Sequence, residues 1–170
     1  MNRRWIVYLL VGCIFGVVDF FYHGFLASIL GRQEAFAPSP LGEFAWLVLS
    51  IGIWLVPVIP IALYEAGISG SCLMSALASI LTWCASIISY YLTNAVQLMF
   101  LGLPSRPELH VSNHSAPLFW TNWAGVFWQD IVLAGIVRWS MVAVIGGFII
   151  GFLTSYVYFQ FKKVKSAKNG

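Results

Sequence analysis

The feature that most limits how this chain can fold is an apolar run from Trp5 to Leu30, which is long enough to cross a bilayer. A helix of about 20 residues spans a hydrocarbon core of about 30 Å. Similar runs cover about 44–65, 71–102 and 131–160. With 60% hydrophobic and only 9% charged residues, a soluble domain of 170 residues could not bury this apolar surface. The sequence predicts an all-α integral membrane protein with four transmembrane helices, the first at about 5–30.

The segments between these runs predict one transmembrane domain over residues 1–170, folded as an antiparallel four-helix bundle. Residues 66–70 form a Gly/Ser turn that is short enough to join two antiparallel helices directly. Residues 31–40 contain charges and prolines that separate the first two helices. Residues 103–130 form the outer loop with an interfacial segment, and 161–170 form a basic cytoplasmic tail.

Basic residues indicate the orientation. Six of the nine lie before the first span or after the last one, which an even number of spans places on one side. They are Arg3, Arg4, Lys162, Lys163, Lys165 and Lys168. Because cytoplasmic loops and tails are enriched in Lys and Arg, we expect a multi-pass protein of the cell membrane with both termini in the cytoplasm. The net charge of +3 is then a topology signal, and no nucleic-acid partner is expected.

Asp19 and His23 are the most informative polar residues, because they interrupt the first apolar run. An ionisable group inside a spanning helix is costly unless it faces protein or water, so such groups are functional candidates. The two residues are four apart and share one helix face. Counting from Trp5, Asp19 lies about 21 Å into the core, in its outer half.

Further polar groups are expected at the same level. Tyr90 and Asn94 fall near the outer end of the third span, and Arg138 falls at the outer boundary of the fourth. We predict that they form a ligand-binding polar pocket with Asp19, in which Arg138 bridges Asp19 and Asp130 or pairs with one of them. The alternative is structural: Arg138 extends to lipid headgroups, and a neutral Asp19 hydrogen-bonds to a neighbouring helix.

An aromatic segment at 117–130 precedes the fourth span. Trp120, Trp123 and Trp128 lie within it, among further aromatic residues at spacings of three and four. Such a segment is typical of an extra interfacial helix that anchors the protein at the headgroup level. A lid over the outer pocket, or a docking surface, is the alternative.

Small residues at steps of four mark the expected helix contacts, because close approach drives helix association in lipid. Gly12 and Gly16 lie in the first span, and Gly147 and Gly151 lie in the fourth. We expect these faces to pack within the bundle. A homodimer, or packing against a larger membrane complex, is the alternative.

Catalytic signatures are absent from the sequence: it has no Walker A motif, no G-x-S-x-G elbow and no H-E-x-x-H. No cofactor or metal is expected, and Glu65 is interpreted as an interfacial charge. We therefore expect a binding or transport component with a polar site in the outer half of the bundle. The alternatives are a non-catalytic accessory or assembly subunit and, least favoured, a membrane enzyme acting on a lipid-linked substrate.

Overall fold

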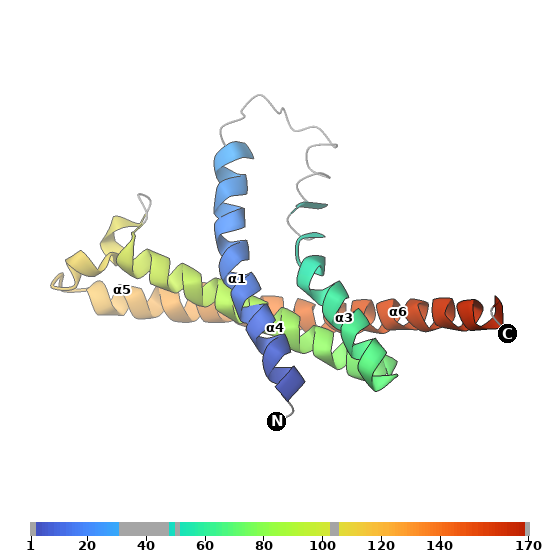
Figure 1. Ribbon diagram of the computed structural model, residues 1–170. Helices are drawn as coiled ribbons and strands as arrows, with labels where there is room; N and C mark the ends of the chain where they lie inside the picture. Colours follow the sequence, from blue (N-terminus) through green and yellow to red (C-terminus); the bar gives the residue numbers. More distant parts are fainter. Residues whose placement is uncertain (1–2, 31–47, 50–51, 103–105, 169–170) are drawn as a thin grey trace.

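A computed structural model describes residues 3–30, 48–49, 52–102 and 106–168 (Figure 1). Within these residues the secondary structure is entirely helical. Three stretches are long and apolar enough to cross a membrane, namely Arg3–Leu26, Cys72–Phe100 and Phe119–Lys165. The elements are α1 (Arg3–Leu30), α3 (Leu55–Ser69), α4 (Cys72–Phe100), the 3-10 turns η1 (Pro107–Leu109) and η2 (Val111–Asn113), α5 (Phe119–Val126), the π-helix η3 (Phe127–Val137) and α6 (Arg138–Lys168).

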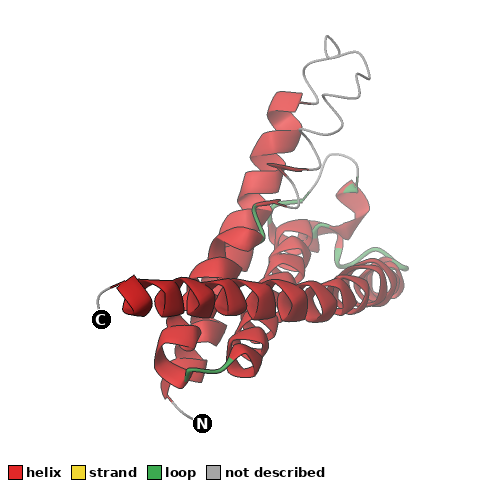
Figure 2. Cartoon of the chain, turned by 90° about the vertical axis from the view of Figure 1, so that its right-hand side faces the viewer, coloured by secondary structure: helices red, strands yellow, loops and turns green. Residues whose placement is uncertain are grey.

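Helix α4 is the centre of the fold, since α1, α3 and α6 all pack against it. Figure 1 shows that the helices are not uniformly parallel, because α1 crosses α4 obliquely. After a 90° turn, the helix that leads to the C-terminus crosses the helix that rises from the N-terminus (Figure 2). The apolar core follows the central helix, with Trp83 and Ile87 of α4 packed against Val58 of α3 and Ala143 of α6.

Contacts along the helices show that their directions alternate. Gly12 and Gly16 of α1 meet successively later positions of α4, so these two helices run the same way. Gly147 and Gly151 of α6 meet successively earlier positions of α4, so α6 runs the opposite way. At one end of the fold Arg4 contacts Glu65. The start of α1 therefore lies beside the end of α3.

Small residues make the close contacts with α4. A Cβ built on Gly12 would overlap the carbonyl oxygen of Thr82, and one on Gly16 would overlap that of Ser86. On the other side, a Cβ on Gly147 would lie 3.0 Å from the Ile80 backbone, and Gly151 packs on Ala76 and Ser79. These four glycines therefore pack within the chain, which agrees with the expected packing inside the bundle. The dimer or larger complex stays a prediction.

The connection between α3 and α4 is shorter than the predicted turn, because α3 continues to Ser69. Gly70 ends the helix with a φ of 64°, a left-handed conformation that favours glycine, and its N–H bonds to the carbonyl of Ala66. Ser71 begins α4 by accepting a hydrogen bond from the N–H of Met74. The two helices pack against each other, as a helical hairpin requires.

Of the four predicted spans, the second, 44–65, agrees least completely with the structure. Residues 44–47 and 50–51 lie outside the described residues, and α3 has 15 residues, fewer than the three long apolar helices. Pro57 stands in the first turn of α3, where a missing N–H is tolerated, and Pro60 lies inside the helix. The prolines thus stand in its first half.

The predicted fourth span, 131–160, is part of a longer helix. The aromatic segment does form α5, but α5 continues without a break through η3 into α6. Apolar helix covers 47 residues from Phe119 to Lys165, and the predicted tail is helical to Lys168. Gly135, within η3, lies directly against the ring of Tyr91 in α4. Because a π-helix has i→i+5 hydrogen bonds, these 11 residues change the helix register and so the directions of the side chains that follow.

Candidate functional site

Asp19 is buried in α1, with 1% of its surface exposed. Neither of its carboxylate oxygens has a hydrogen-bond partner in the described part of the chain. The His23 Nδ1 lies 3.1 Å from the Asp19 carbonyl oxygen, with which it hydrogen-bonds, and 3.1 Å from Oδ1. Contact with Oδ1 becomes an ion pair only when the imidazole is protonated. Asp19 and His23 therefore form the predicted pair on one face of α1.

Aromatic rings surround this pair. Tyr90 of α4 is the central ring, with its centroid 5.7 Å from that of His23 and 5.4 Å from that of Phe20. Trp54, at the start of α3, lies 6.1 Å from Tyr90. Tyr90 is also close enough to Asp19 for a Coulombic interaction. The structure thus brings together three of the six predicted pocket residues, Asp19, His23 and Tyr90, and adds Trp54.

The other three predicted residues are Asn94, Asp130 and Arg138. Asn94 is half-buried on α4, one turn beyond Tyr90. Asp130 is exposed and lies 3.9 Å from Arg106, which also pairs with Glu108 at 3.3 Å. Arg138 is exposed and interacts electrostatically with Tyr91. Neither the predicted bridge from Arg138 to Asp19 and Asp130 nor a pair with one of them is among the ion pairs of the described residues. Asp130 lies beside Arg106 instead.

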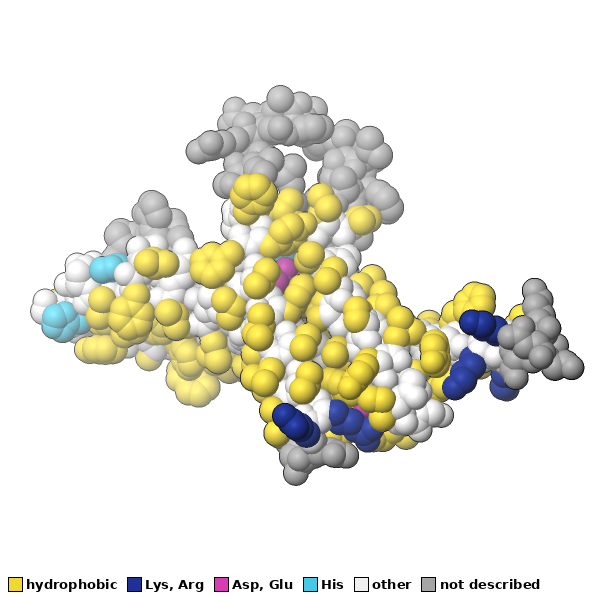
Figure 3. Space-filling view, in the orientation of Figure 1, with side chains coloured by type: hydrophobic (Ala, Val, Ile, Leu, Met, Phe, Trp, Pro, Cys, Tyr) yellow, Lys and Arg dark blue, Asp and Glu magenta, His cyan; other side chains and the backbone are white. Residues whose placement is uncertain are grey.

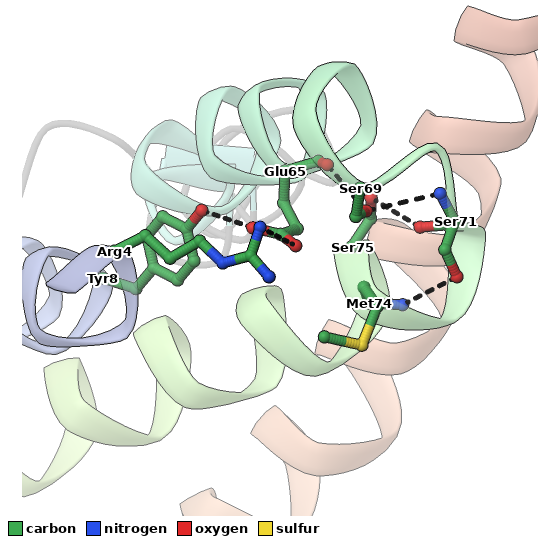
Figure 4. Close-up of polar contacts among 7 residues, drawn as sticks. All are labelled: Arg4, Tyr8, Glu65, Ser69, Ser71, Met74 and Ser75. Carbon is green, nitrogen blue, oxygen red and sulfur yellow. Dashed lines mark hydrogen bonds and ion pairs between the residues drawn. The ribbon is translucent and has the colours of Figure 1, made fainter. Parts of the chain in front are cut away.

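A second buried acid, Glu65 of α3, lies beside the start of α1, whereas Asp19 lies further along that helix. Its side chain is fully buried, and Tyr8 donates a hydrogen bond of 2.5 Å to Oε2. The guanidinium of Arg4 lies 3.4 Å from Oε1. Figure 4 shows Arg4 and Tyr8 reaching from α1 toward Glu65, beside the turn formed by Ser69 and Ser71. Glu65 is therefore a buried link between α1 and α3, and its interpretation as an interfacial charge understated its role.

A sequence signal for this second cluster did exist. Arg4 and Tyr8 are four apart, so they share one face of α1. That face has a cation and a hydroxyl donor near the helix start, where a carboxylate partner is expected. What the sequence did not supply was the pairing with Glu65, which is 57 residues from Tyr8.

The aromatic segment contacts the 3-10 turn η1, and its Trp123 and Phe127 pack against the cluster that contains Ala95 and Leu98 of α4. Trp123 donates a hydrogen bond of 3.0 Å from Nε1 to the carbonyl of Leu109, which holds α5 to the preceding loop. Trp120 and Trp128 are about 60% exposed. Figure 1 places α5 at the end of α4, away from the crossing with α1. The interfacial anchor and the lid both stay predictions.

The buried carboxylates of Asp19 and Glu65 are groups that can bind a proton or a cation. No group of three or more His, Cys, Asp or Glu side chains in the described part of the chain could hold a metal ion. Comparisons with protein-family models, with curated proteins and with solved structures found no match to this chain. The function is therefore argued from the buried acids, whose ionised forms are costly without a positive partner.

Proposed function

We propose that this chain is a multi-pass protein of the cell membrane with four spans and both termini in the cytoplasm. The alternating directions of α1, α3, α4 and α6 support this topology, because they bring both termini to one end. Figure 3 shows the Lys and Arg side chains near the two termini, beside a surface made mostly of apolar side chains. In this arrangement α3 lies within the second span, and α5 lies at the outer interface.

Within that topology the protein is a binding or transport component whose site is Asp19 with His23. The observation that carries this proposal is that Asp19 is 1% exposed while, within the described part of the chain, neither carboxylate oxygen has a hydrogen bond and His23 Nδ1 lies 3.1 Å from Oδ1. A carboxylate in such surroundings is stabilised by taking up a proton or a cation. The neighbouring imidazole of His23 places a nitrogen that can donate or accept a hydrogen bond 3.1 Å from Oδ1. The proposed ligand is therefore a proton or a small monovalent cation.

Ion flux across liposomes tests this proposal. The purified protein is reconstituted into vesicles that contain a pH-sensitive dye, and a potassium diffusion potential drives protons inward. Uptake of radioactive sodium and rubidium is measured in parallel. We expect the wild-type protein to carry one of these cations faster than protein-free vesicles, and Asp19→Asn to lower that rate to the protein-free level. Asp130→Asn is the matched control, because it removes an exposed carboxylate with the same substitution.

Two results would overturn the proposal. One is a wild-type protein that carries none of the three cations above the protein-free rate. The other is Asp19→Asn at the wild-type rate while it remains monodisperse and helical, which would make Asp19 a structural residue.

An accessory subunit is the second candidate. The observation that favours it is the exposed apolar surface of α6, where Ile145 and Leu153 are 63% and 54% exposed. Lipid or a partner protein could cover this surface. Extraction in mild detergent separates the two cases: an accessory subunit co-purifies with a larger protein at fixed stoichiometry, whereas a self-contained binding or transport protein does not.

A further inference from the structure

A shallow apolar groove of about 480 Å³ lies between α3 and α6, and Asp19 and His23 are not among its lining residues. Its lining residues are Leu63, Leu153, Thr154, Val157, Tyr158 and Phe161. The α6 part runs from Leu153 to Phe161, which is about 12 Å along the helix. One leaflet of the hydrocarbon core is about 15 Å deep, half of the total. The groove is therefore long enough to extend through most of the depth of one leaflet.

The end of the groove lies beside the turn between α3 and α4. A Cβ on Gly67 would lie 3.8 Å from the Tyr158 hydroxyl oxygen, so α6 approaches α3 closely at this level. Glu65 and Arg4 join α3 to the start of α1 within the same turn of helix. The groove thus lies in the half of the fold that carries both chain termini, which is the cytoplasmic half in the proposed topology.

Basic side chains continue the groove beyond Phe161. Lys162 follows Tyr158 by four residues, and Lys165 follows Phe161 by four, so both lie on the groove's face of α6. Both lysines are exposed. No carboxylate follows Asp130 in this helix, so α6 itself offers them no acidic partner. The apolar groove therefore ends in a positively charged surface.

We propose that this groove binds an anionic phospholipid, with one acyl chain between α3 and α6 and the phosphate beside Lys162 and Lys165. Charge complementarity selects this occupant over a neutral lipid, because a basic residue near the membrane surface attracts anionic headgroups. Lysine binds phosphate as a point charge and needs no fixed geometry, which suits exposed flexible side chains. The proposal does not depend on Asp19.

Native mass spectrometry of the purified full chain tests it, with phosphatidylglycerol and phosphatidylcholine of identical acyl chains as probes. We expect wild-type protein to bind phosphatidylglycerol more tightly. Lys162→Gln and Lys165→Gln should each lower that affinity about fivefold, the effect of one basic residue near an anionic surface. Arg106→Gln removes one positive charge at the far end of α4 and should leave the affinity unchanged.

A second pair of variants tests the groove itself. Val157→Trp fills it and should weaken the binding of both lipids, whereas Ile145→Trp on an exposed part of α6 should not. Equal affinity for the two lipids, or lysine variants with unchanged affinity, would overturn the proposal and leave only general lipid contact. A dimer that Val157→Trp dissociates would overturn it too, because a second copy would then occupy the groove.

Discussion

Glu65 and Asp19 are both buried acids, but their surroundings differ. Glu65 has a fixed cation, Arg4, and a hydroxyl donor, Tyr8. Among the described residues, only the imidazole of His23 lies within ion-pair distance of Asp19. A carboxylate paired with an arginine suits a structural link, whereas one whose neighbour is an imidazole has no permanent cation beside it. This difference is why the proposed ligand is placed at Asp19 and a structural role at Glu65.

A double-mutant cycle tests the structural assignment. Arg4→Gln leaves the buried Glu65 without a cation, and we expect it to lower the free energy of unfolding by about 3 kcal/mol. That figure is at the low end of the range for buried pairs because Arg4 is 25% exposed. Adding Glu65→Gln removes the unpaired buried charge and should restore part of the lost free energy of unfolding. The expected coupling energy between the two positions is about 1–3 kcal/mol. Unfolding in mixed detergent, followed by tryptophan fluorescence, measures each variant.

The exposed pair of Arg106 and Glu108 supplies the control for this cycle. These side chains lie 3.3 Å apart but are 43% and 51% exposed. Water screens such a pair, so the same two glutamine substitutions should show a coupling of about 0–1 kcal/mol. Equal coupling in the two cycles would show that Glu65 is not held by a buried ion pair.

At the residue scale the sequence predicted the contact between Asp19 and His23 but missed the cluster around Glu65. The reason for this difference is physical. Asp19 and His23 are neighbours within one helix turn, so their contact follows from helical periodicity. The partners of Glu65 depend on how α1 and α3 cross, which a single sequence does not specify. Asp130 shows the same limit, since its actual partner, Arg106, lies in a loop whose path periodicity cannot predict.

At the scale of elements, the contact between α1 and α4 depends on glycine. A Cβ at position 16 meets the Ser86 carbonyl oxygen, so Gly16→Ala must push the two helices apart. We expect it to lower the free energy of unfolding by about 1–3 kcal/mol, as overpacking does. Gly24→Ala, in the same helix with no described atom within 4 Å, should instead raise it by about 0.5–1 kcal/mol through helix propensity. The detergent unfolding assay compares the two, and a Gly16→Ala variant as stable as wild type would contradict this packing.

Helix boundaries were predictable where local chemistry fixes them. The start of α4 at Ser71 agrees with the predicted start of the third span, because a serine cap is a local feature. The left-handed Gly70 that ends α3 is equally local, although the end of that helix was predicted at 65. No such feature separates the aromatic segment from the fourth apolar run. A helix that begins at Phe119 therefore continues to Lys168 through the π-helix, where the sequence reading placed a boundary near position 131.

At the scale of the whole molecule, the long helix exceeds what a bilayer needs. Its 47 residues from Phe119 to Lys165 measure about 70 Å, more than twice a core of about 30 Å. Tilt and extension into both interfaces are the two ways to place such a helix. The exposed Trp120 and Trp128 at one end and Lys162 and Lys165 at the other suit extension, since both residue types favour the interface.

Side-specific cysteine labelling tests the topology in intact cells. The background replaces Cys13, Cys72 and Cys84 with alanine, and each variant then carries one new cysteine. With four spans, a membrane-impermeant maleimide should label Ser115→Cys from outside and Lys165→Cys only after permeabilisation. Both positions are exposed in the fold, so protection reflects the membrane and not burial. If α3 does not cross, α1 and the C-terminal helix end on opposite sides, and the Lys165→Cys variant will be labelled from outside while Ser115→Cys is protected.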